Sequence, residues 1–247
     1  MKKQITLLIA ICSIIFGASA QRIVEKNVPV VSGQDIELEF NYAELIKVTK
    51  WDKNEIYVKA SVSINCDEDN DIFKLEVENK ADNIRISSDY GDLKKITKKY
   101  ILKEDKDGNT YINGRTLSIN TFYEVNVPED VELYINSISG NVEIDDYSSG
   151  VLRIKLISGD IDIKKIEGPL YAKSISGFVD LSLGSDQKVD LRMKTVTGEI
   201  YTNLDIDFDK IGTNMGVVGS KVAGTINGGG KEIELESVSG DIYLRKR

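Results

Sequence analysis

Histidine is absent from this chain of 247 residues, and only two cysteines, three prolines and one tryptophan occur in it. Without histidine, the chain cannot form Ser-His-Asp or Cys-His nucleophile systems, or the common zinc sites that use imidazole. Cys12 lies in an apolar stretch near the start, so Cys66 is the sole cysteine of the remaining chain. We therefore expect no intramolecular disulfide, and we predict that Cys66 is a buried, inert thiol.

The first 20 residues have the features of a secretory signal. Lys2 and Lys3 precede an apolar stretch over residues 5–16, and residues 18–20 (Ala-Ser-Ala) provide the small side chains that a signal peptidase requires. The apolar stretch is too short to cross a bilayer as a helix, which takes about 20 residues. We predict that residues 1–20 are a signal peptide and that the protein is exported to the periplasm or to the outer cell surface.

The formal net charge of the chain is −8. An acidic balance argues against nucleic acid and against anionic membrane surfaces as partners, because both attract basic patches. No glycine-rich loop opens a helix, and residues 228–230 (Gly-Gly-Gly) lie between expected strands, so no nucleotide cofactor is predicted. We expect no cofactor, no nucleic acid partner and no membrane-spanning segment.

Alternation of apolar and polar residues dominates the chain and is typical of half-buried β-strands. Residues 36–40, 55–59 and 73–77 are examples. The Asp-Gly-Asn sequence at residues 107–109 lies between two further apolar runs and predicts a hairpin turn. We expect this hairpin, within residues 94–120, to project from an otherwise stacked structure.

From Val131 onward the alternation becomes a repeat of about 20 residues. Each repeat has two short strands separated by a Ser/Thr-Gly pair, and successive glycines are 19, 18, 21 and 42 residues apart. Because 42 is twice 21, we predict a degenerate sixth repeat over residues 214–227, with Gly219 and Gly224. The five recognisable pairs are Ser139-Gly140, Ser158-Gly159, Ser176-Gly177, Thr197-Gly198 and Ser239-Gly240.

A period near 20 residues with two strands per unit predicts one coil of a parallel β-solenoid, because only stacking buries the apolar face of each repeat. We predict an all-β, single-stranded parallel β-helix, with a repeat solenoid over residues 131–247. Residues 21–130 are expected to form a more irregular β region that is continuous with it. Glycine permits the bend at each corner, and the hydroxyl column before the glycines is expected to bond backbone groups. The alternative is that this column lines a ligand groove.

Three stretches resemble the putative adhesins, a family of exported bacterial proteins with a β-solenoid domain of unknown function. They are residues 46–58, around Trp51, residues 125–131 and residues 224–242, and the likeness extends from about residue 33 to the end. The resemblance implies a parallel β-helix-like fold in both halves, with coils in the N-terminal half, and a location outside the cytoplasm. It implies no catalytic residue.

One acidic turn has the spacing of a calcium loop. Asp67, Asp69 and Asp71 alternate, and Glu78 falls where a bidentate ligand would follow, but Ile72 occupies the position that such loops reserve for glycine. The turn is interpreted as a solvated one, and no metal ligand, catalytic residue or cofactor-binding residue is predicted.

Two functions remain open, with a purely structural role inseparable from the first. The first is a non-enzymatic envelope or surface protein that binds a glycan or a protein partner. The alternative is a carbohydrate-active lyase or hydrolase, for which Asp162 and Asp180 on adjacent coils are candidate carboxylates. Tyr201 and Tyr243 lie two coils apart in the expected order, so no sugar-stacking platform is predicted. The basic residues 245–247 are expected to cap the last coil against end-to-end association.

Overall fold

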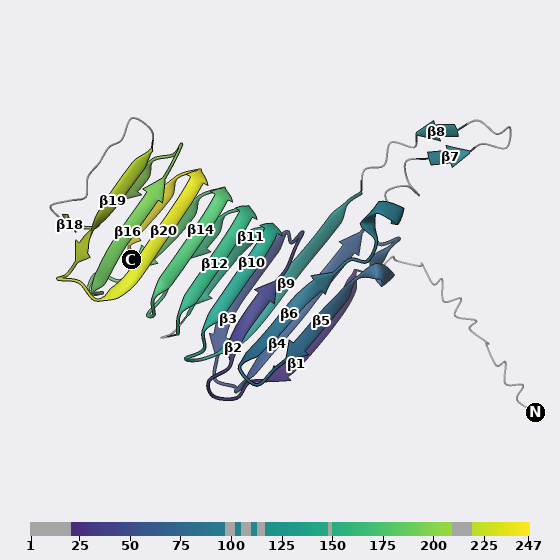
Figure 1. Cartoon of the computed structure of the whole chain (residues 1–247), viewed down its shortest axis with the longest axis horizontal. Coiled ribbons are helices and arrows are strands. Elements are labelled where there is room, and N and C mark those ends of the chain that lie inside the picture. Colours follow the sequence, from purple (N-terminus) through teal and green to yellow (C-terminus); the bar gives the residue numbers. More distant parts are fainter. Residues whose placement is uncertain (1–20, 97–101, 105–109, 113–116, 148–149, 209–218) are drawn as a thin grey trace, which may run out of the picture.

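The structure is a computed structural model that describes residues 21–96, 102–104, 110–112, 117–147, 150–208 and 219–247. Two β-sheets of nine and ten strands face each other along one long axis, and the apolar core lies between them (Figure 1). The nine-stranded sheet is called sheet A and the ten-stranded sheet is called sheet B. The all-β, largely parallel arrangement predicted from the repeats is confirmed.

Sheet A has, in spatial order, β1 (Arg22–Pro29), β4 (Glu55–Ile64), β9 (Ile119–Pro128), β3 (Leu45–Trp51), β11 (Asn141–Asp146), β13 (Ile161–Ile163), β15 (Val179–Leu183), β21 (Ile242–Lys246) and β17 (Ile200–Thr202). Sheet B has β18 (Asp207–Phe208), β19 (Ser220–Ile226), β16 (Val189–Thr195), β20 (Lys231–Ser239), β14 (Leu170–Ser176), β12 (Leu152–Ser158), β10 (Leu133–Ser139), β2 (Asp35–Glu39), β6 (Asn83–Asp89) and β5 (Lys74–Asn79).

Each coil consists of one strand in sheet B followed along the chain by one strand in sheet A. The strands of neighbouring coils pair in parallel. Alternate side chains of each strand point inward and stack in register, as expected from the pleat of a β-strand. This stacking replaces the disulfides that the chain lacks. One fully buried row in sheet A runs through Ile46, Val142, Ile161, Val179 and Ile242.

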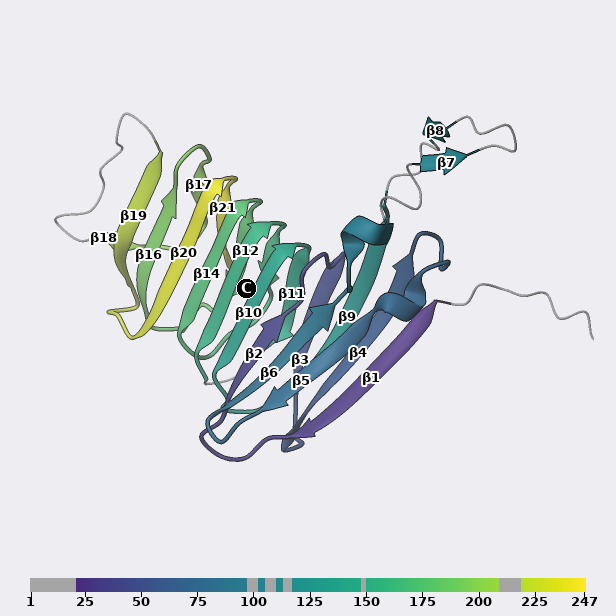
Figure 2. The same ribbon diagram turned by 45° about the vertical axis from the view of Figure 1, so that its right-hand side comes forward.

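The order of the coils along the stack differs from their order in the sequence. The coil of β20 and β21 comes last in the chain, yet it lies between the coil of β14 and β15 and the coil of β16 and β17. Figure 2 shows β21 beside β17 at this end of the stack. The sequential stacking implied by the repeat spacing is therefore wrong for the last two coils.

The predicted degenerate repeat is a reversed strand instead of a coil. Residues 220–226 form β19, which pairs antiparallel with β16, and residues 214–218 lie outside the described residues. After β19 the chain crosses the start of β16 at Asn227. The side-chain amide of Asn227 holds this crossing, since it donates to the carbonyl oxygens of Ser185 and Gln187 at 3.0 and 2.8 Å. This crossing places β19 and β20 on opposite sides of β16. Among its described residues the repeat region therefore has five coils and two further strands, β19 antiparallel to β16 and β18 antiparallel to β19.

The N-terminal half repeats the same device in reverse. The coil of β2 and β3 comes earlier in the chain than the coil of β6 and β9. In space, however, the coil of β2 and β3 lies between the coil of β6 and β9 and the coil of β10 and β11. Antiparallel strands then cover this end, with β5 on β6 and β4 on β9. The coils that the family resemblance implies for this half are present, and both sheets continue without a break across residue 130.

The predicted hairpin is present as two short strands. Strands β7 (Leu102–Glu104) and β8 (Thr110–Ile112) pair antiparallel and form a separate two-stranded sheet. They lie apart from sheets A and B in Figure 1. The residues of the turn between them are outside the described residues.

The basic tail does not cap the stack, contrary to the sequence-based expectation. Because β21 is an inner strand, Arg245 bonds Asp180 on β15, and the backbone N–H groups of Lys246 and Arg247 donate to Asn203 and Leu183. The tail therefore ties the inserted coil to both of its neighbours.

The corner glycines are in contact across the coils. A Cβ atom on Gly159 would lie 2.2 Å from the carbonyl oxygen of Gly140, and one on Gly177 would lie 2.1 Å from that of Gly159. The series continues in spatial order, with 2.2 Å from Gly240 to Gly177 and 2.0 Å from Gly198 to Gly240. Real Cβ atoms do not approach backbone that closely, so each corner requires glycine for space.

Backbone conformation adds a second requirement at four of these corners. Gly140, Gly159, Gly177 and Gly240 have φ between 128 and 156°, which favours glycine, whereas Gly198 is not in that region. At Gly198 glycine is therefore required for space alone. At Gly33 it is required for backbone conformation alone, because φ is 88° and a Cβ there would meet nothing within 4 Å.

We predict that Gly198→Ala lowers the free energy of unfolding by about 2 kcal/mol or more, since its methyl group would force two coils apart. Gly33→Ala, where only backbone strain is added, should cost about 1 kcal/mol. Urea unfolding followed by circular dichroism measures both. Equal losses in the two variants would contradict the close-contact role of the corner glycine.

Candidate functional site

The hydroxyls that bond the corners are two residues earlier than expected. The side-chain hydroxyls of Ser174 and Ser237 are buried and donate to the carbonyl oxygens of Gly159 and Gly177 at 2.8 and 2.9 Å. Thr195 makes the same bond to Gly240 at 2.8 Å. They satisfy carbonyl groups that the close glycine contact would otherwise leave unpaired.

The hydroxyl column predicted at the residue before each glycine lies on the surface. Thr197 donates its hydroxyl to the carbonyl oxygen of Val238 at 3.1 Å. The other members make no side-chain hydrogen bond within the part of the chain that the structure describes. They are Ser139, which is half-buried, and Ser158, Ser176 and Ser239, which are exposed. The sequence period identified the corner, but it did not show which hydroxyl faces inward.

A stacked aromatic pair lies at the C-terminal end of sheet A, with Tyr201 exposed and Tyr243 half-buried. Tyr201 on β17 and Tyr243 on β21 are in register, and their rings stack with centroids 5.2 Å apart and planes at 10°. The expectation that these two tyrosines are two coils apart is wrong, because β21 is inserted next to β17. Since β17 is the edge strand of sheet A, one ring face of Tyr201 has no neighbouring strand of that sheet.

Charged and polar groups surround this pair. Tyr201 donates its hydroxyl to Glu199 at 2.6 Å, and Tyr243 donates to Asp241 at 3.1 Å. The guanidinium of Arg245 lies 5.1 Å from the ring centre of Tyr243. The hydrogen bond to Glu199 raises the pKa of Tyr201 to about 12. The tyrosines, Asn203, Arg245 and Lys246 line a shallow hollow of about 450 Å³.

The candidate carboxylate pair is found on the same face. Asp162 and Asp180 are register partners on β13 and β15. Burial raises the pKa of Asp180, and the charge of Asp162 adds to that effect, while Arg245 opposes it. The two carboxylate oxygens of Asp180 lie 2.9 and 2.7 Å from the guanidinium nitrogens of Arg245. Proton transfer from Asp180 would therefore have to break a two-pronged ion pair, which disfavours its use as a general acid.

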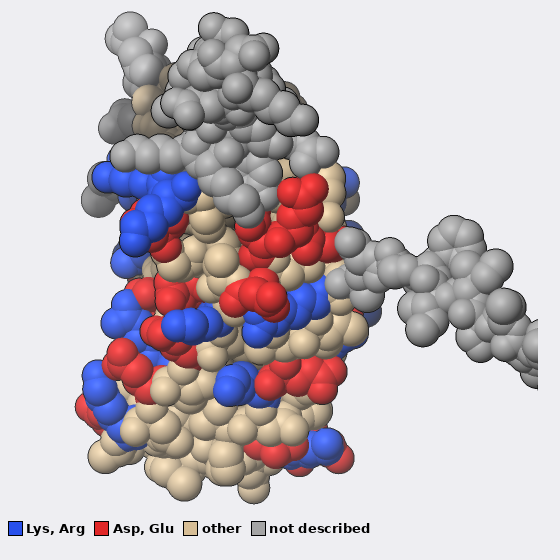
Figure 3. Space-filling view, turned by 90° about the vertical axis from the view of Figure 1, so that its right-hand side faces the viewer, with Lys and Arg blue, Asp and Glu red and all other residues tan. Residues whose placement is uncertain are grey.

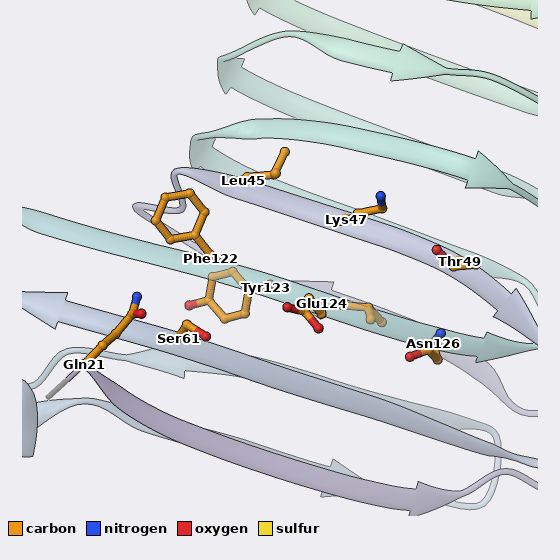
Figure 4. A pocket seen from close by; sticks show the side chains of 10 residues that line it. Gln21, Leu45, Lys47, Thr49, Ser61, Phe122, Tyr123, Glu124 and Asn126 are labelled. Atoms are coloured by element: carbon orange, nitrogen blue, oxygen red, sulfur yellow. The ribbon is translucent and has the colours of Figure 1, made fainter.

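A second hollow of about 600 Å³ lies on sheet A at the opposite end, over β3, β9 and β4 (Figure 4). Leu45 and the exposed ring of Phe122 are register partners and form its apolar part. Lys47 and Glu124 contribute charge, but each is already paired, Lys47 with Asp145 at 2.8 Å and Glu124 with Lys59 at 3.2 Å. Its ionic groups are thus largely neutralised within the protein.

The acidic turn near Asp67 is held by amide side chains. Asn70 donates to Asp67 at 2.9 Å, and Asn65 donates to Asp69 at 2.7 Å. Glu78 is on β5 and pairs with Lys80 at 3.2 Å. The described residues include no group of three acidic, cysteine or histidine side chains positioned to hold a metal ion. Cys66, predicted to be buried, is exposed in this turn.

The N-terminal end of the stack has a mixed surface. Basic and acidic side chains are interspersed over it, without a large area of one sign (Figure 3). No helix in the described part of the chain is long and apolar enough to cross a membrane.

Comparison with family models gives a match to a domain described as Toastrack DUF4097, over residues 43–245. This span begins just before β3 and ends within β21, so the strands that precede it are β1 and β2. The chain belongs to the Toastrack DUF4097 family. Membership agrees with the stacked, solenoid-like fold and with the resemblance found in the sequence.

Among solved structures, a "putative cell adhesion protein" from Clostridium sporogenes is similar, with a TM-score of 0.61 at 15% identity, covering 92% of this chain and 100% of that one. A "putative adhesin" from Bacteroides fragilis has a TM-score of 0.25 at 10% identity, covering 93% of this chain and 99% of that one. Comparison with curated proteins finds no match. At these identities the Clostridium likeness shows the Toastrack fold alone.

We predict that Glu199→Ala lowers the pKa of Tyr201 from about 12 toward the ordinary value. Neutral Tyr201 donates to Glu199, so this bond exists below the raised pKa and is lost as the pH rises through it. The measurement is the tyrosinate absorbance of the wild type and the variant as a function of pH. An unchanged titration curve would contradict the Tyr201–Glu199 bond.

Proposed function

We propose that this Toastrack protein is an exported, non-enzymatic binding protein of the bacterial envelope or surface, and that it binds a glycan at the C-terminal end of sheet A. The expected signal peptide supports export. The stacked pair Tyr201 and Tyr243 is the observation that carries the proposal, because the exposed ring of Tyr201 rests on the half-buried ring of Tyr243 and hydrogen-bonding groups surround both.

The chemistry of the hollow fits a sugar. An aromatic ring presents a large rigid apolar face, which a pyranose can cover with its C–H groups while its hydroxyls remain free to form hydrogen bonds. Around Tyr201 these hydroxyls would meet the carboxylate of Glu199, the side chain of Asn203 and the ammonium of Lys246. A small-molecule site usually combines an apolar surface with a small number of polar groups that converge on the ligand.

Support for a binding role over catalysis comes from the carboxylates. Asp180 is engaged by Arg245 through both oxygens, and Glu199 and Asp241 accept hydrogen bonds from the tyrosines. These three carboxylates are thus each engaged by a partner within the protein. The name of the Clostridium structure agrees with this role but does not carry it.

The test is a glycan array, followed by calorimetry on any glycan that binds. We expect Tyr201→Ala to weaken binding about tenfold or more, since the stacking surface is removed. Tyr134→Ala is the matched control, because Tyr134 lies on the outer face of sheet B, and it should bind as the wild type does.

Two results would contradict the proposal. One is a blank array, and the other is equal loss in both variants. Release of reducing sugar from a bound polysaccharide would instead favour the alternative of a lyase or hydrolase, and Asp180→Asn should then abolish that release.

A further inference from the structure

A ridge of exposed apolar side chains follows the corner between sheet B and sheet A. Each repeat places one isoleucine or valine two residues before the corner glycine, directly after a buried residue that is serine or threonine in four repeats and Leu156 in the other. The four most exposed members, in spatial order, are Ile138 at 40%, Ile157 at 52%, Ile175 at 45% and Val238 at 37%. The flanking registers align them in one row, with about 4.8 Å between coils. We name this row the apolar ridge.

The fold does not require these side chains to be apolar. They lie outside the buried core, and threonine would suit the strand equally well because it is also β-branched. Single exposed apolar residues are ordinary on a protein surface, whereas a continuous row marks a contact surface. The apolar ridge recurs on adjacent coils, so it is a continuous row and marks a contact surface.

A row of lysines runs beside the ridge on the outer face of sheet B. Lys155 and Lys173 precede Ile157 and Ile175 by two residues and therefore share their face. Lys194 and Lys221 continue the row on β16 and β19, where they are register partners. Its one acidic member, Glu236, is paired with Lys173 at 2.7 Å. The row has four lysines against that one glutamate, so it is locally positive in a chain of net charge −8.

The other side of the ridge has the opposite character. Asp160 and Asp241 follow the corner glycines on the side of sheet A, and their carboxylates accept hydrogen bonds from the backbone N–H groups of Phe178 and Glu199. The ridge thus separates a lysine face from an acidic face. A partner that covers the ridge and the lysines must be apolar in its interior and negatively charged at its surface.

We propose that the apolar ridge and the lysine row dock the protein on an anionic lipid surface. The isoleucines enter the interface between headgroups and acyl chains, while the lysines attract anionic headgroups. A second copy with its ridge antiparallel would bring two lysine rows together, whereas a parallel pair would set lysines against the acidic side, so the experiment below includes the dimer as an outcome. The net negative charge of the chain, which argues against an anionic surface in the sequence analysis, opposes docking only weakly here, because charges farther than about 8–10 Å from the lipid are largely screened at physiological ionic strength. Sheet A, with the tyrosine pair, then faces away from the lipid.

The experiment is cosedimentation of residues 21–247, which include all the strands, with vesicles of phosphatidylcholine alone or mixed with phosphatidylglycerol. We expect binding to the mixed vesicles only, and weaker binding in high salt. Ile157→Thr with Ile175→Thr should reduce binding to the mixed vesicles about tenfold or more. Lys155→Gln with Lys194→Gln should reduce it as well and should abolish the dependence on phosphatidylglycerol.

Two controls keep the result specific. Ile23→Thr removes an equally exposed isoleucine, at 57%, from the edge strand β1 of sheet A and should leave vesicle binding unchanged. Tyr201→Ala should also bind vesicles as the wild type does, so failure of the glycan site and failure of the lipid surface are distinguishable. Circular dichroism verifies that each variant is folded.

Three outcomes would overturn the proposal. The first is absence of binding to mixed vesicles, and the second is undiminished binding of the folded isoleucine variant. The third is a dimer of the wild type in size-exclusion chromatography that the isoleucine variant fails to form, with no vesicle binding by either. That third result would assign the ridge to contact between two copies.

Discussion

Close contact between glycine corners is the constraint on which the stack depends. Parallel strands of successive coils can pair at their usual spacing only if the chain turns tightly between sheets B and A. At each turn the carbonyl oxygen of one glycine occupies the place where the next coil's Cβ would be, at 2.0–2.2 Å in the four glycine-to-glycine contacts. Buried hydroxyls bond three of these four carbonyls, those of Gly159, Gly177 and Gly240. The register of both sheets follows from this column, and so do the rows of buried apolar side chains.

The same constraint explains why coils can stack out of sequence. A corner glycine lies against the corner backbone of its spatial neighbour, which is another glycine in four contacts and Ala43 beside Gly140, so a coil with the right corner fits beside different neighbours. The coil of β20 and β21 uses this freedom to enter between two earlier coils, and β2 and β3 occupy a matching inner place at the other end. Antiparallel strands cover both ends of sheet B and the N-terminal end of sheet A, which reduces the unpaired edge that parallel growth would leave.

Much of this fold could be predicted from the sequence, because alternation and repeat spacing report which residues face the core. The alternation after each corner glycine predicts that Val142, Ile161 and Ile242 point to the interior, and all three are fully buried. Spatial order could not be predicted, since every repeat has an equivalent corner and the spacing of 42 residues suits either a sixth coil or a detour.

The candidate site was missed for the same reason. Tyr201 and Tyr243 are adjacent only because the last coil is inserted, so no periodicity in the chain could bring them together. The apolar ridge, in contrast, is visible in the sequence as the isoleucine or valine two residues before each corner glycine. This spacing alone did not show that the residue is exposed, because the chain bends directly after it.

The two faces beside one corner have separate roles in these proposals. Sheet A carries the aromatic pair and its carboxylates, while sheet B carries the lysine row, and the ridge lies between them. A two-layer stack is suited to this division because its outer faces point in opposite directions and are held rigidly by a shared core. Both proposals therefore depend on the order of coils being the one described.

Cross-linking between coils tests that order most directly. In a Cys66→Ser background, Lys173→Cys is combined with either Glu236→Cys or Lys194→Cys. Lys173 and Lys194 each pair with Glu236 and so are two strands, about 10 Å, apart, beyond the reach of a disulfide. We predict that mild oxidation links position 173 to position 236 and leaves the pair at positions 173 and 194 unlinked. A disulfide between positions 173 and 194, with none between 173 and 236, would show that the coils stack in sequence order and would contradict the inserted coil.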